Sequence, residues 1–179
     1  MLILFNKPYG VITQFSEHEN YMSLKDFIPY KNVYPAGRLD ADSEGLVILT
    51  DNGKIQNQIA SPESDNKKTY WVQVENIPEE SDLKKLRDGV LIKDYITKKA
   101  SVKLIKEPKL WERDKPIRFR KNIPTSWLEI KISEGKNRQI RKMTATINCP
   151  TLRLIRISVG KYHLDNLVPG EFRLIGDQG

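Results

Sequence analysis

The sequence has few of the residues that metal sites, disulfides and membrane segments require. Among 179 residues there are one cysteine and two histidines. An internal disulfide is therefore impossible, and a structural zinc site of four Cys or His ligands cannot be filled. The longest apolar runs, residues 1–5 and 46–49, fall far short of the ~20 residues of a membrane helix. The N-terminus lacks the basic region and cleavage site of a signal peptide, so we expect a cytoplasmic protein with no membrane contact.

Charge is divided unevenly along the chain. The whole sequence has a net charge of +7. Residues 1–90 hold 10 basic and 14 acidic side chains, a net −4, whereas residues 91–179 hold 20 and 9, a net +11. A basic half on a compact protein favours a polyanionic partner, with nucleic acid first. The alternative is a basic surface that serves only solubility.

Strand patterns outnumber helix patterns. Buried or alternating apolar runs predict strands over residues 2–5, 45–50, 70–75, 126–132, 151–159 and 171–175. Helices are expected between Pro78 and Gly89 and over residues 137–147. Because strands and helices do not alternate regularly, the sequence predicts a single α+β domain over residues 1–179. The charged, proline-punctuated residues 107–124 are expected to be a loop or hairpin insertion, because a strand resumes directly after them.

Three carboxylates lie close together beside an arginine in residues 37–45. If this segment were extended, Asp40, Asp42 and Glu44 would face the same way. They could form a Mg²⁺ or Ca²⁺ site, although the segment lacks the central glycine and late glutamate of a calcium loop. They could equally be an inert solvated loop, or contain one catalytic carboxylate held by arginine. The residues alone leave these three interpretations open.

A second charged segment, residues 134–143, opens the predicted helix over 137–147. Cations at a helix N-terminus oppose the helix dipole, and a phosphate or carboxylate partner would resolve that conflict. Arg138 and Arg141 share a helix face, so one could reach a phosphate while the other reaches an internal acid. The alternative is an ordinary amphipathic helix with a basic face. Tyr70, which follows two lysines, could stack on a base but is more often a core residue.

Five motifs, in order along the chain, resemble those of the RsuA-type pseudouridine synthases. They are residues 6–11 (NKPYGV), 37–46 (GRLDADSEGL), 68–70 (KTY), 134–143 (EGKNRQIRKM) and a closing segment with 152–156 (LRLIR), 159–160 and 170–172. The resemblance implies a mixed, mainly antiparallel sheet in two lobes around a central cleft, flanked by helices. It also implies isomerisation of uridine in RNA with no cofactor and no metal. Many members carry an N-terminal S4-like domain, which is not expected here because the motifs begin at residue 6.

The resemblance gives the motif residues roles. It implies that Asp40 is the essential aspartate, that Arg141 pairs with it and that Tyr70 stacks on the uracil. Arg38 resembles the residue that fills the gap left by a flipped nucleotide, and Leu154 is expected to pack against the pocket. The candidates for phosphate contacts are Lys7, Lys136, Arg138, Lys142 and Arg156.

Residues 116–128 resemble one subgroup of that family, which acts on the large-subunit (23S) ribosomal RNA. Nothing in the sequence calls for an obligate partner chain, so we expect a monomer. One rival interpretation is a non-catalytic RNA-binding or ribosome-assembly protein. The other is a metal-dependent nuclease or glycosidase that uses Asp40, Asp42 and Glu44.

Overall fold

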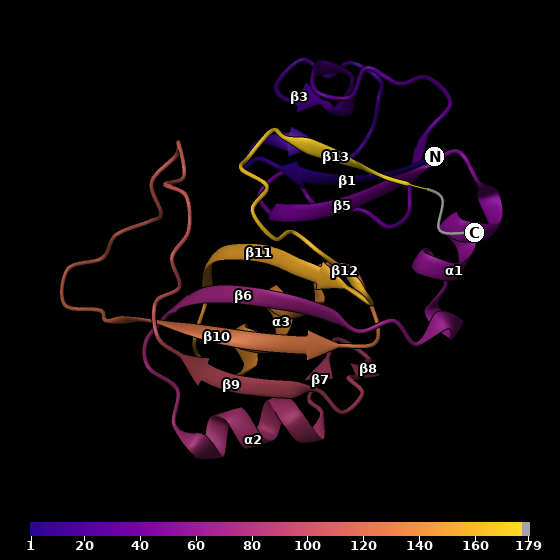
Figure 1. The fold of residues 1–179 in the computed structure, drawn as a ribbon. Helices are drawn as coiled ribbons and strands as arrows, with labels where there is room; N and C mark the ends of the chain where they lie inside the picture. Colours follow the sequence, from indigo (N-terminus) through magenta and orange to yellow (C-terminus); the bar gives the residue numbers. More distant parts are fainter. Residues whose placement is uncertain (177–179) are drawn as a thin grey trace.

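The computed structural model describes residues 1–176 and is organised around one sheet (Figure 1). Within these residues the sheet holds nine strands: β1 (Leu2–Lys7), β4 (Tyr34–Pro35), β5 (Glu44–Thr50), β6 (Lys68–Glu75), β9 (Ser101–Ile105), β10 (Thr125–Ile132), β11 (Thr151–Val159), β12 (Tyr162–His163) and β13 (Phe172–Ile175). Two short ribbons pair β2 (Val11–Ile12) with β3 (Met22–Ser23), and β7 (Leu91–Ile92) with β8 (Tyr95–Ile96). The helices are α1 (Gly53–Ala60), α2 (Glu80–Asp88) and α3 (Gln139–Thr146), with 3-10 turns η1 (Leu24–Asp26) and η2 (Pro62–Ser64).

The sheet divides into two lobes at its one parallel junction. Its order is β13-β1-β5-β11-β6-β10-β9, and along this order only β5 and β11 run parallel. That junction has two register pairs, Ile155 with Glu44 and Arg156 with Gly45. Figure 1 shows β13, β1 and β5 in the upper lobe and the other four strands in the lower lobe. The predicted α+β class with a mixed, mainly antiparallel sheet is confirmed.

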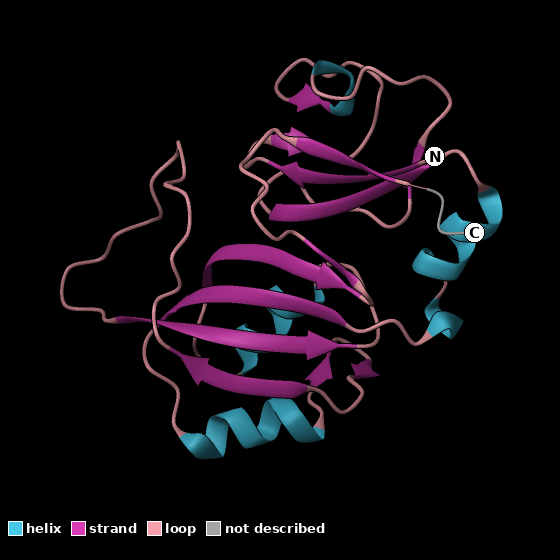
Figure 2. Cartoon of the chain, viewed as in Figure 1, coloured by secondary structure: helices cyan, strands magenta, loops and turns pink. Residues whose placement is uncertain are grey.

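The lower lobe is covered on both faces. Strand residues of one parity, among them Tyr70, Val72 and Ile130, pack with residues of α2 and α3. The opposite parity, including Trp127, packs with the insertion's Trp111. Figure 2 shows α2 below the lower strands and α3 behind them, as labelled in Figure 1. The insertion therefore lies on the sheet face that the helices leave open.

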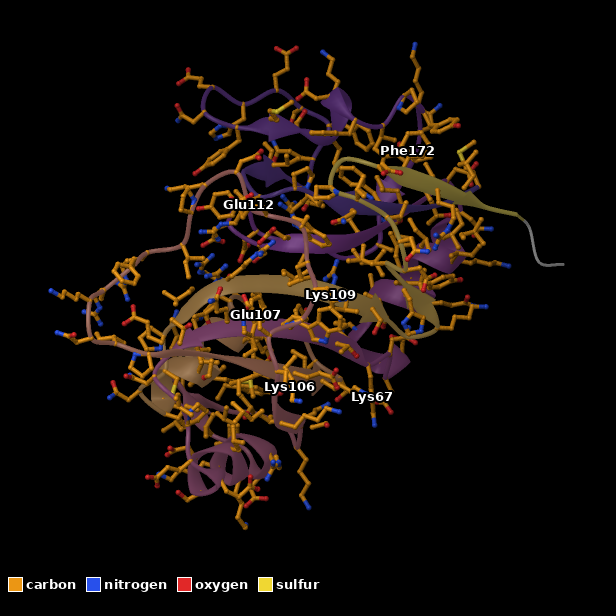
Figure 3. The ribbon with its side chains drawn as sticks, turned by 60° about the vertical axis from the view of Figure 1, so that its left-hand side comes forward. Lys67, Lys106, Glu107, Lys109, Glu112 and Phe172 are labelled. Atoms are coloured by element: carbon orange, nitrogen blue, oxygen red, sulfur yellow. The ribbon has the colours of Figure 1, made fainter. Side chains whose placement is uncertain are left out.

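Residues 107–124 contain no helix or strand, so they form a loop and not a hairpin. Figure 3 shows Lys106, Glu107, Lys109 and Glu112 along a path from the lower strands toward the upper lobe. Trp111 reaches the upper lobe, where its Nε1 donates to Glu44 Oε1 at 2.8 Å. The insertion thus connects the two lobes on the face opposite the helices.

The helix predicted over residues 137–147 is shorter in the structure, as α3 covers Gln139–Thr146. Arg138 precedes it in the left-handed conformation, with φ 53°. That conformation is unfavourable for a residue with a Cβ atom, so contacts around it must hold it. They include Glu134, whose Oε1 accepts from the Lys98 amide and from Gln139 Nε2, both at 2.8 Å.

Candidate active site

The segment that carries Asp40 forms a loop tied to the N-terminal turn. Thr13 Oγ1 donates to the Leu39 carbonyl at 2.7 Å and accepts from the Leu39 amide at 3.1 Å. The Gly10 amide donates to the Ala41 carbonyl at 2.7 Å, and the Ser43 amide donates back to the Asp40 carbonyl at 3.0 Å. The last bond closes a turn. Residues 40–43 are therefore not extended.

This turn separates Asp40 and Asp42 from Glu44, although all three would face the same way in an extended segment. Asp40 and Asp42 point toward Arg138 at the start of α3. Glu44 begins β5 and is buried on the other side, where Arg153 binds it. The condition for a shared orientation, an extended segment, is therefore not met here. Within residues 1–176, no group of three or more His, Cys, Asp or Glu side chains is placed to hold a metal.

Arg138 is the residue that pairs with Asp40. Its Nη1 donates to Asp40 Oδ2 at 3.0 Å and to Asp42 Oδ1 at 3.1 Å, and its Nη2 donates to Asp42 Oδ2 at 2.9 Å. Arg141 was expected in that position, but its Nη2 donates to the Asp42 carbonyl at 2.9 Å instead. The left-handed backbone just before α3 turns Arg138 toward the carboxylates, whereas Arg141, one turn later, faces the loop backbone. Both arginines thus hold the same loop.

Electrostatics favour the contacts of Arg138 and Arg141 with the Asp40 loop, which we call the arginine clamp. Burial raises the pKa of Asp42, but the hydrogen bond from Arg138 and the charges of Arg141 and Arg138 outweigh it, so the net shift is downward. The hydrogen bond to Asp42 raises the pKa of Arg138. Burial lowers the pKa of Arg141, although the charge of Asp42 opposes this. Asp42 is therefore ionised at neutral pH and bridges the two arginines.

A pocket of about 520 Å³ opens beside this clamp, between the loop, the start of α3, β6 and β11. That volume lies in the range of small-molecule sites. The pocket brings together most of the predicted residues: Arg38, Asp40, Tyr70, Lys136, Arg138, Arg141, Leu154 and Arg156. Tyr70 is 7% exposed and belongs to the core as well as to the pocket wall. Lys142 is half-buried and is not among the pocket's lining residues.

Lys7 is placed differently from what was expected. It is 0% exposed, and its Nζ donates to the carbonyls of Pro8 at 2.8 Å and Val11 at 2.6 Å. Burial lowers its pKa to about 7, against the opposing charges of Glu44, Asp42 and Asp40. The expected phosphate contact is wrong for this residue because its ammonium group is enclosed. Lys7 instead holds the turn whose Gly10 binds the Asp40 loop.

Two further cations lie at the pocket. Arg156 is 4% exposed; its Nε donates to the Leu46 carbonyl at 2.8 Å, while its buried Nη2 has no hydrogen-bond partner in the described part of the chain. Lys68 also lines the pocket, and burial together with the charge of Arg156 lowers its pKa. Lys68 belongs to the KTY motif noted in the sequence but was not among the candidates for phosphate contacts. Its signal was present, since it stands two residues before Tyr70 and therefore on the same strand face.

A buried ion pair supports the loop from behind. Arg153 binds Glu44 with two hydrogen bonds, Nε to Oε2 at 2.8 Å and Nη2 to Oε1 at 2.9 Å. Its Nη2 also donates to the Trp111 carbonyl at 3.0 Å, while the Trp111 indole donates to Glu44. The pair joins β5, β11 and the insertion. No local sequence signal indicates it, because its partners are 109 residues apart.

The chain belongs to the RNA pseudouridylate synthase family, because the family model of that description matches residues 1–146. This confirms the resemblance seen in the five motifs. The match contains the loop of Asp40, Tyr70 and the start of α3. Within residues 1–176, no helix is long and apolar enough to cross a membrane.

The chain is also similar to individual proteins and to a solved structure. The chain is 54% identical over 174 residues to the "Ribosomal large subunit pseudouridine synthase E" of Vibrio vulnificus (strain CMCP6), covering 97% of this chain and 74% of that protein. It is 49% identical over 177 residues to the protein of the same name from Xanthomonas campestris pv. campestris, covering 97% and 95%. Among solved structures, a "Crystal structure of pseudouridylate synthase" matches with TM-score 0.79 and 28% identity, over 98% of this chain and 70% of that one. The last match confirms the pseudouridine synthase fold.

Proposed function

We propose that this protein isomerises a specific uridine of large-subunit (23S) ribosomal RNA to pseudouridine, in the cytoplasm and as a monomer, without metal or cofactor. The observation that carries the proposal is the placement of Asp40. Its carboxylate lies at a pocket walled by Tyr70, and Arg138 fixes it at 3.0 Å. The choice of RNA is supported by the names of the two relatives, which specify the ribosomal large subunit.

In this reaction the N1–C1′ bond of uridine breaks, the base turns, and C5 bonds to C1′. The proton on C5 is then lost and N1 gains one, so product and substrate are isomers. Asp40 acts either as the nucleophile at C1′ or as the base at C2′, and both roles require an ionised carboxylate. The hydrogen bond from Arg138 orients that carboxylate, and Arg141 holds the loop that carries it.

The target nucleotide must leave its stack, because C1′ is not reachable inside a helix. The flipped uracil then packs against Tyr70 and Leu154, which line the pocket. Arg38 is exposed at the pocket edge and fills the vacated position. Lys136, Lys68 and the free Nη2 of Arg156 supply cations for the nucleotide's phosphate and carbonyl groups. Lys142 contacts phosphate outside the pocket.

The test uses unmodified 23S ribosomal RNA treated with wild type and with Asp40→Asn. Pseudouridine is mapped by carbodiimide adducts and primer-extension stops, since mass does not distinguish the isomers. We expect one new stop with wild type and none with Asp40→Asn. Asp94→Asn makes the same chemical change in the β7–β8 turn and should match wild type.

Turnover by Asp40→Asn near the wild-type level would refute the role of Asp40. Tight RNA binding by wild type without any stop, on free RNA and on immature large subunits, would favour the non-catalytic RNA-binding interpretation instead.

A further inference from the structure

The insertion presents an aromatic side chain to solvent near the end of β6. Phe119 is 85% exposed, the highest exposure among the large hydrophobic side chains of residues 1–176. It lies in the charged loop between β9 and β10, which projects beyond the strands at the left of Figure 1. Neither the fold nor the candidate active site uses this ring.

Ion pairs on both sides impose the outward position of Phe119. Arg118 Nη2 binds Glu75 Oε1, and Arg120 donates from Nε to Glu75 Oε2 at 3.0 Å. Glu75 ends β6, and its side chain is 3% exposed. Because both neighbours of Phe119 turn toward the sheet, the ring between them is turned away from it. The hydrogen bond from Arg118 lowers the pKa of Glu75, so this anchor persists at neutral pH.

The surroundings of the ring indicate which partner it fits. Residues 115–121 contain four basic side chains and no acidic one. Glu75 balances one of these charges, so the tip stays positive. An apolar protein partner would require further exposed apolar groups, but Arg120, Lys121 and Asn122 follow Phe119 directly. An aromatic ring among cations suits an unpaired nucleotide, since the ring stacks on the base while the cations meet phosphates.

The tip is held at the end of the strand whose other half carries Tyr70 of the pocket wall. Glu75 lies five residues along β6 from Tyr70, which is about 17 Å at the strand rise. The insertion also contacts the N-terminal turn that binds the Asp40 loop and, behind that loop, Glu44. Trp111 donates to Glu44, and the Arg113 guanidinium lies 4.3 Å from the centre of the Tyr9 ring.

We propose that residues 107–124 form an RNA-binding arm, in which Phe119 stacks on an unpaired base of the substrate RNA outside the catalytic pocket. The inference deepens the proposed function and rests on it for the identity of the RNA. The arm would add affinity through a base that the pocket does not hold. Glu75 keeps the arm's tip in place before RNA binds.

The test compares Phe119→Ala, Phe119→Leu and Phe119→Trp in the full chain. Affinity for unmodified 23S ribosomal RNA is measured in an Asp40→Asn background, so that no turnover interferes, and pseudouridine formation is measured with Asp40 intact. We expect Ala and Leu to weaken binding on the order of 10-fold, and Trp to retain it, because stacking needs an aromatic face. The salt dependence of binding should not change, since no charge is removed. Tyr34→Ala, at a 55% exposed aromatic residue of the edge strand β4, is the matched control and should bind as wild type does.

Three outcomes would overturn the inference, and a fourth would overturn only the proposed function. If Phe119→Ala and wild type bind RNA equally, the RNA-binding role of Phe119 is refuted. Pseudouridine formation by wild type would still support the proposed function. If Phe119→Leu binds RNA as tightly as wild type, the contact is a general apolar one and not stacking. A defect on immature large subunits but not on free RNA would assign Phe119 to a protein of the particle. If wild type forms no pseudouridine on any ribosomal RNA, the proposed function fails, and the binding data then judge the arm separately.

Discussion

Replacing Arg153 by methionine would expose how strongly the two lobes depend on one buried ion pair. The side chains of Arg153 and Glu44 are 10% and 1% exposed, and two hydrogen bonds of 2.8 and 2.9 Å join them. Methionine fills much of the space but leaves the Glu44 charge buried, with the Trp111 indole as its remaining close donor. Removing one partner of a buried pair costs about 3–5 kcal/mol. For a chain of this length that loss lowers the melting temperature by roughly 6–20 °C.

Urea unfolding at pH 7, followed by circular dichroism and tryptophan fluorescence, measures this loss. Arg173→Met is the matched control, because Arg173 pairs with Asp165 at 3.4 Å with both side chains well exposed. Such exposed pairs contribute ~0–1 kcal/mol, so this variant should stay near wild type. The double variant Glu44→Met/Arg153→Met should recover much of the loss, since it removes the uncompensated charge.

A loss below 1 kcal/mol for Arg153→Met would refute the reasoning. It would mean that water or another cation reaches Glu44 in the folded protein. Failure of the double variant to recover stability would show that the geometry of the pair, and not its charge, holds β5 to β11.

Two further variants test the support of the Asp40 loop. The pKa of Lys7 is about 7 in the folded chain and ~10.4 in an unfolded one, so the unfolded chain binds more protons between these values and Lys7 makes stability rise as pH increases from about 7 to about 10. Lys7→Met should lack this rise, and a stability difference from wild type that is constant from pH 6 to 10 would contradict the assignment. Gly45 has φ +109°, and a Cβ atom there would lie 2.3 Å from the Arg156 carbonyl oxygen. Gly45→Ala should therefore lower the urea midpoint and reduce pseudouridine formation, whereas Gly53→Ala, with open space around its Cβ position, should do neither.

Most elements could be predicted because their signals are local. The apolar runs at β1 and β5, the alternation in β10 and the glycine after α2 all depend on neighbouring residues. The predicted helix start at residue 137 was wrong because a left-handed residue precedes α3, and tertiary contacts hold that conformation. The prolines and charges of residues 107–124 indicated an insertion but did not distinguish a loop from a hairpin.

The composition of the site was predictable, but its pairing was not. The motifs indicated Asp40, Tyr70, Arg138 and Arg141, and the structure brings them to one pocket. The turn at residues 40–43 and the backbone conformation of Arg138 decide which arginine binds Asp40. No periodic pattern in the sequence predicts either of them. The burial of Lys7 and the pairing of Glu44 with Arg153 depend on segments that meet only in the folded sheet.

The place of β13 has a consequence for the order in which the chain can fold. Residues 172–175 pair with residues 2–5, so β1 lacks this partner until β13 has been synthesised. The lower lobe is incomplete as well until β11, at residues 151–159, supplies the neighbour of β6 and the link to β5. Such distant pairings make folding slow, and neither lobe can close on a translating ribosome until the final strands have left the exit tunnel. The pocket, whose lining runs from residue 36 to residue 159, is thus assembled only after β11 has been synthesised.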